Sequence, residues 1–205
     1  MFAVNSANAS IITPSTETIN VGTHSGTFSG NTRGFWFTAP VDFWITGIDV
    51  PTDASTANFS TSILRLPTVP PFFSATTTLF DILFEERNQA SAITGLAIKI
   101  NIGDVIGVLG NRGNSNSYGS SPFMTSIFGN AVTLTRFGTQ NVIGNSTTVA
   151  GMQVWQESGG SISRLNLTVS NTNPVTASVP TPATLPILFL GICGLLIARR
   201  NKKHR

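Results

Sequence analysis

The 205-residue sequence predicts an all-β protein: an antiparallel, jelly-roll-like β-sandwich, followed by a polar stalk and one C-terminal transmembrane helix. Three observations lead to this prediction. Roughly eight to ten short stretches alternate apolar and polar residues and are separated by turn-forming residues. No amphipathic helical period interrupts them. Residues 183–198 then form a continuous apolar run, and a basic cluster follows it.

The first strands are expected near the two earliest tryptophans. A short strand is predicted at residues 18–21, and the dense apolar cluster at residues 34–51 predicts a hairpin whose second strand spans 43–50. Strict alternation in that strand would place four residues on one face: Trp44, Thr46, Ile48 and Val50. We therefore expect Trp44 in the core.

The remaining strands follow from the same alternation and from the turns between them. They are predicted at residues 59–66, 76–86, 93–100, 105–109, 123–128, 131–137, 152–157 and 162–169. Pro67, Pro70 and Pro71 break the sheet after the first of these. Residues 110–122 are nearly devoid of apolar side chains and predict the longest loop.

The charge distribution separates the body of the chain from its tail. Five of the twelve Lys and Arg residues lie in the last seven positions, so the rest of the chain has a small excess of acid despite the formal net charge of +3. A clustered basic face, which nucleic acid binding needs, is therefore not expected. The single cysteine, Cys193, lies in the apolar run, so the body has neither a disulfide nor a thiol nucleophile.

The pattern divides the chain into four parts. Residues 1–9 lack the basic start and apolar core of a signal peptide, but Ala7-Asn8-Ala9 is typical of a cleavage site. We interpret them as the remnant of an export signal that begins upstream; the alternative is a polar leader. Residues 10–170 are the predicted sandwich, 171–178 a linker, and 179–205 the tail.

Residues suited to catalysis or metal binding are sparse. His24 is the only histidine before the tail, and we interpret it as a loop residue, since no Gly-x-Ser-x-Gly elbow accompanies it. Zinc ligands are not clustered. Eight carboxylates are candidates for a glycosidase pair: Asp42, Asp49, Asp53, Asp81, Glu85, Glu86, Asp104 and Glu157. Asp49 and Asp53 are candidates for a structural calcium; no other cofactor is expected.

Aromatic side chains give the remaining functional signal. Trp36, Trp155 and Tyr118 are candidate glycan-binding residues, because flat rings can stack against the C–H face of a sugar. Tyr118 lies in the predicted polar loop and is the aromatic residue expected to be exposed.

The tail has the composition of a membrane anchor. As a helix, residues 183–198 would be about 24 Å long at ~1.5 Å per residue, against about 30 Å for the hydrocarbon core. The residues that mark this span are Ala183, Leu185, Leu188, Leu190, Leu195 and Ala198. The basic residues that would stay in the cytoplasm are Arg199, Arg200, Lys202, Lys203 and Arg205. The alternative is a buried helix of a soluble domain, but the run has no polar face.

This tail resembles a PEP-CTERM sorting signal. The resemblance rests on Val179-Pro180-Thr181-Pro182, the glycine-bearing apolar run and the basic end, about an eighth of the chain. It implies export in a Gram-negative bacterium, processing by an exosortase-like membrane enzyme, and an association with exopolysaccharide and biofilm. Thr181 departs from the glutamate that the signal usually has.

Two functions from different classes are consistent with these observations. The first is a non-catalytic protein of the cell surface or extracellular matrix that binds glycan. Its body would lie in the periplasm on an inner-membrane anchor, or reach the cell surface or matrix after processing. The second is a secreted polysaccharide-active enzyme, a glycosidase or lyase.

Overall fold

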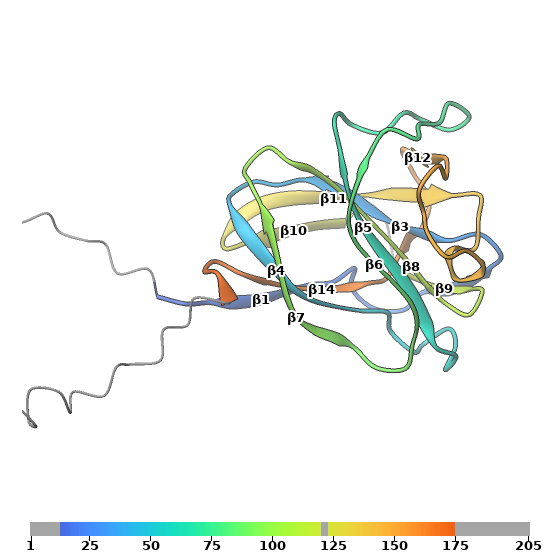
Figure 1. Cartoon of the computed structure of the whole chain (residues 1–205), viewed down its shortest axis with the longest axis horizontal. Helices are drawn as coiled ribbons and strands as arrows, with labels where there is room; N and C mark the ends of the chain where they lie inside the picture. The colour runs from blue at the N-terminus through green and yellow to red at the C-terminus, as the bar shows by residue number, and fades with distance from the viewer. Residues whose placement is uncertain (1–12, 120–122, 175–205) are drawn as a thin grey trace, which may run out of the picture. The chain divides into compact units, whose positions relative to one another are not determined.

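The computed structural model describes residues 13–119 and 123–174, which form one compact unit (Figure 1). The all-β prediction is confirmed: the unit consists of antiparallel sheets and one short 3-10 turn. Within these residues, no helix has the length and apolar character needed to cross a bilayer. The predicted export-signal remnant at residues 1–9, sorting motif, membrane span and basic end lie outside the described residues, as does the second half of the predicted linker, residues 175–178.

The smaller sheet has four strands in the order β1-β14-β4-β7. Their bounds are Thr16–Ile19 for β1, Asn166–Ser170 for β14, Phe43–Asp49 for β4 and Ile93–Ile100 for β7. The first and last described strands therefore pair with each other, through a register that places Ile19 opposite Leu167.

The larger sheet has the main order β10-β11-β3-β8-β5-β6. These strands are β10 (Phe123–Ile127), β11 (Asn130–Thr139), β3 (Arg33–Thr38), β8 (Val105–Arg112), β5 (Phe59–Leu66) and β6 (Asp81–Gln89). Four short strands extend it: β2 (Gly26–Ser29), β9 (Ser115–Gly119), β12 (Val154–Gln156) and β13 (Ile162–Ser163). The 3-10 turn spans Ile143–Asn145.

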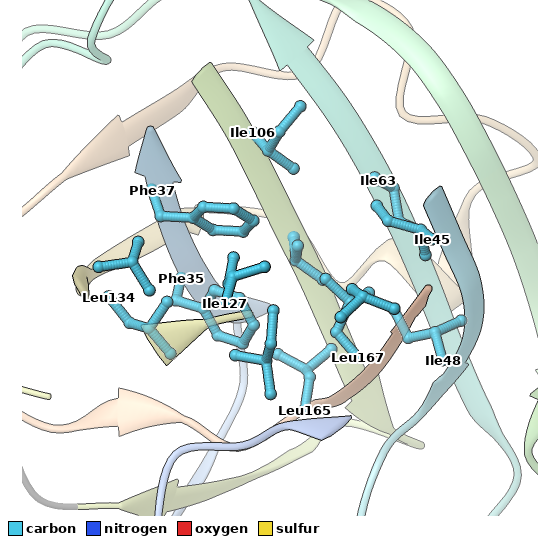
Figure 2. Packing of buried hydrophobic residues seen from close by; sticks show 14 of the residues in the cluster. Phe35, Phe37, Ile45, Ile48, Ile63, Ile106, Ile127, Leu134, Leu165 and Leu167 are labelled. Atoms are coloured by element: carbon cyan, nitrogen blue, oxygen red, sulfur yellow. The ribbon is translucent and has the colours of Figure 1, made fainter. Parts of the chain in front are cut away.

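The main core lies between the two sheets, which gives a β-sandwich-like arrangement. Figure 2 shows Phe35 and Phe37 of β3 and Ile106 of β8 on one side of this core, and Ile48 of β4 and Leu167 of β14 on the other. All of these side chains are at most 1% exposed. Burying each contributes roughly 1.5–3 kcal/mol of transfer free energy.

A second core covers the outer face of the larger sheet. Leu64 and Leu66 of β5 and Phe137 of β11 pack there under residues 140–154, which contribute Ile143 and other apolar side chains. Because β5 is buried on both faces, its sequence contains few exposed positions and only a weak alternation.

The predicted alternation of β4 is wrong in its first half. Phe43 and Ile45 face the core and Trp44 is half-buried on the opposite face, yet Ile48 is again in the core. The register with β14 explains the change: Ile45 pairs with Val169 and Gly47 with Thr168, so β4 has one extra residue between these two pairs. A β-bulge near Thr46 therefore reverses the sides on which residues point.

The long loop predicted at residues 110–122 is also wrong. β8 continues to Arg112, Gly113 turns the chain at a φ of +57°, and β9 follows at once. The segment is polar because its buried amide side chains form hydrogen bonds with backbone groups of neighbouring segments. Asn116 accepts the Arg33 N–H at 2.8 Å and donates to the carbonyls of Phe28 and Asn31 at 3.2 and 2.9 Å.

Candidate functional site

The connection between β5 and β6, residues 67–80, has the most exposed apolar side chains of any described segment, and we call it the aromatic loop. Four of the seven large apolar side chains that are exposed in the described parts of the chain lie on it: Val69, Phe72, Phe73 and Leu79. Phe72 and Phe73 are 57% and 51% exposed. Prolines at its start prevent β5 from continuing.

Backbone hydrogen bonds hold the aromatic loop against β12. Phe73 N–H donates to the Gln156 carbonyl at 3.0 Å, and Gln156 N–H donates to the Pro71 carbonyl at 2.9 Å. Thr77 and Val154 exchange a further pair at 3.0 and 2.9 Å. The Phe73 ring packs on Trp155, with the ring centroids 5.1 Å apart. The loop therefore has a fixed path while its rings stay accessible.

Two grooves lie next to the aromatic loop. The first, about 360 Å³, is at its base and is lined by Arg65, Leu66, Pro67, Thr78, Leu79, Phe80 and Asp81. The second, about 410 Å³, is the amide groove, lined by Gln140, Asn141, Ser146, Thr148, Ala150, Gly151, Met152 and Gln153. It adjoins the loop because Gln153 directly precedes Val154, the partner of Thr77.

The three aromatic residues predicted to bind glycan are not brought together as an exposed surface. Tyr118 is only 9% exposed and stacks on Phe28 at 5.9 Å, so the prediction that it is exposed is wrong. Trp155 is 1% exposed. Trp36 is half-buried, and its indole N–H donates to the Gln156 side-chain oxygen at 3.1 Å. The exposed aromatic surface that sequence reasoning missed is the aromatic loop.

His24 lies in a loop, as predicted, but the fold brings it to a serine and an aspartate. His24 Nδ1 is 2.9 Å from Ser117 Oγ, and Ser117 Oγ donates to Asp53 Oδ2 at 3.4 Å. Arg164 forms an ion pair with the same Asp53 oxygen. A catalytic triad needs the imidazole between the hydroxyl and the carboxylate. Here the serine is in the middle and is 1% exposed, so the arrangement is not that of a triad, and the cluster links the loops of His24 and Asp53 to β9.

Most of the candidate carboxylates are bound to arginines. Five of the eight form ion pairs: Asp49, Asp53, Glu85, Asp104 and Glu157. The two considered for calcium have different partners, with Asp49 3.4 Å from Arg112 and Asp53 paired with Arg164. Across residues 13–119 and 123–174, no group of three or more His, Cys, Asp or Glu side chains is placed to hold a metal ion.

Comparisons with known proteins do not assign this site. No family model, no curated protein and no solved structure matches the chain.

Proposed function

We propose that this protein is an exported, non-catalytic protein of the cell surface or extracellular matrix that binds polysaccharide through the aromatic loop and the amide groove. The observation that carries the proposal is that the loop with the exposed rings pairs with β12, the strand that directly follows Gln153 of a groove rich in amides and hydroxyls. A sugar ring offers C–H groups to an aromatic face and hydroxyls to amide side chains, and this surface has both kinds of group.

We also propose a jelly-roll topology for the sandwich. The orders β1-β14-β4-β7 and β3-β8-β5-β6 support it, because they correspond to the two four-stranded sheets that a pair of Greek keys produces. The hairpin of β10 and β11 would then be an addition beside β3.

The binding proposal predicts that Phe72→Ala reduces retention on exopolysaccharide by about tenfold, since a stacked ring contributes on the order of 1 kcal/mol or more. The measurement is a pull-down on the native polysaccharide. Met124→Ala is the matched control, because Met124 is 74% exposed but belongs to β10. Equal retention of Phe72→Ala and the parent would remove the aromatic loop from the proposal. Release of reducing sugar in the same samples would favour the enzyme alternative.

The tail is proposed to be a sorting signal that an exosortase-like enzyme processes near Val179-Pro180-Thr181-Pro182. Expression with and without such an enzyme tests this, with mass and membrane fractionation as readouts. We expect loss of the tail only when the enzyme is present. A full-length membrane protein under both conditions would reduce the tail to a plain anchor, and a soluble full-length protein would exclude the membrane interpretation.

A further inference from the structure

Arg33, the first residue of β3, is a buried cation without a carboxylate partner among the described residues. It is 6% exposed, and burial lowers the pKa of its guanidinium. Its Nη1 donates to the carbonyls of Thr32 and Thr139 at 3.1 and 2.6 Å. A buried charge without a counter-ion is costly, so this arrangement needs a reason.

Two aromatic rings hold the guanidinium in place. Its central carbon lies 5.2 Å from the centroid of the Phe28 ring and 4.7 Å from that of Trp155. Gly138 makes the second contact possible, because a Cβ there would lie 2.8 Å from Arg33 Cδ and 3.0 Å from Trp155 Cη2. The rings that pack on the guanidinium and the carbonyls that accept from Nη1 together fix the orientation of its other edge, formed by Nε and Nη2.

That other edge has an unused donor. Arg33 Nε is buried and has no hydrogen-bond partner among the described residues. The indole nitrogen of Trp155, which is also buried, has no acceptor. Nε and Nη2 together form the edge through which arginine binds a carboxylate with two parallel hydrogen bonds. Since each of these groups can only donate, the missing partner must be an acceptor.

Charge favours an anionic acceptor. The neighbouring Arg136 is already neutralised by Glu157, whose carboxylate lies 2.8 Å away. No described carboxylate forms an ion pair with Arg33, and only Glu157 and Tyr118 favour its charged form from further away. A neutral acceptor would satisfy the hydrogen bonds but not the charge.

We propose that the Nε edge of Arg33, together with the indole N–H of Trp155, is a binding site for a carboxylate. Trp155 connects this site to the aromatic loop, because its ring contacts both Arg33 and Phe73. The carboxylate can come from a uronate residue of a polysaccharide or from a small free acid. The site stands on its own contacts and does not require that Phe72 binds sugar.

The experiment measures the melting temperature of the full-length protein in sodium acetate, sodium glucuronate and sodium polygalacturonate. Sodium chloride at equal ionic strength and glucose are the reference solutions. A ligand that binds the folded state stabilises it in proportion to the logarithm of its concentration above Kd. We expect a rise of a few degrees with the carboxylates alone. A response to polygalacturonate identifies a polymeric source, and a response limited to acetate and glucuronate identifies a small acid.

Variants decide whether Arg33 is responsible. Arg33→Gln should abolish the rise, whereas Arg65→Gln, which removes an arginine paired with Asp104, should retain it. If Arg33→Gln does not fold, nuclear magnetic resonance of the arginine Nε–H groups in the parent gives the answer. One such signal should shift with saturation as acetate is added, and less so in Trp155→Phe. Equal melting in chloride and carboxylate, or a rise that persists in Arg33→Gln, would overturn the proposal.

Discussion

Tyr118 carries the only phenol of the sequence, and its hydroxyl is shielded from water. Burial disfavours the phenolate and raises the pKa of Tyr118 above its ordinary value of 10.0, although Arg136 and Arg33 oppose the shift. A raised pKa means that the folded state holds this proton more tightly than the unfolded state. The associated stability is complete below pH 10.0 and is lost as the pH rises through the folded pKa.

Alkaline titration of the folded protein should therefore show the phenolate absorbance band only above pH 10.0. Adding denaturant should bring the midpoint back to about 10. The band reports on Tyr118 alone, since the sequence has no other tyrosine. In Tyr118→Phe both the band and its share of the alkaline instability should disappear. A midpoint at or below the ordinary value in the folded protein would contradict the burial of this ring.

Among the elements, β3 depends on close contact with β8. A Cβ at Gly34 would overlap the carbonyl of Val108, with the carbonyl carbon at 2.8 Å, and backbone atoms cannot move aside as a flexible side chain does. Gly26 in β2 has nothing within 4 Å of the same position, and neither glycine has a positive φ. The two glycines thus differ in the room available for a Cβ atom, and neither needs glycine for its backbone conformation.

We predict that Gly34→Ala lowers the free energy of unfolding by about 3 kcal/mol or more, whereas Gly26→Ala stays within about 0.5 kcal/mol of the parent. Denaturant titration followed by circular dichroism measures both. A similar cost for the two substitutions would show that β3 and β8 are not in such close contact.

The strands also show how far the sequence determines the fold. The alternation of apolar and polar residues located most of the strands, because successive side chains of a half-buried strand point to the core and to solvent in turn. It failed in β4, because a bulge opposite β14 changes the side on which residues point without any signal in residue type. Alternation failed again around Asn116, where polar side chains are buried because they form hydrogen bonds with backbone groups. The segment is a buried strand and not a loop, so Tyr118 is buried as well.

The aromatic loop was missed for a related reason. Pro70 and Pro71 correctly indicated the end of a strand, but residue types cannot show whether Phe72 and Phe73 turn inward or outward. A pair of phenylalanines next to prolines was the available signal. Arg33 gave none, since its position between two rings depends on contacts between segments far apart in the chain.

At the scale of the whole described unit, β1 joins the two ends of the fold. Ile19 is 2% exposed in the main core, whereas Thr18 next to it is exposed. Because the first strand pairs with the last, loss of this contact should weaken the complete unit and not only one end.

Ile19→Ala is therefore expected to cost 2–5 kcal/mol, as large-to-small changes in a core usually do, while Thr18→Ala should cost little. Tryptophan fluorescence, to which the buried Trp155 contributes, and circular dichroism should lose signal in one coincident transition in each variant. Separate transitions for the two probes would indicate that the sheets unfold independently.

The place of β14 in the smaller sheet also determines how the molecule bears mechanical load. β14 lies between β1 and β4, and its last residue, Ser170, is close in sequence to Pro174, where the described residues end. Its hydrogen bonds lie across the strand, so a pull along its axis strains the bonds to both neighbours together. If the proposed tether pulls along the axis of β14, that pull acts in shear. The sandwich would then resist tearing, because many bonds must fail at once before β14 is extracted.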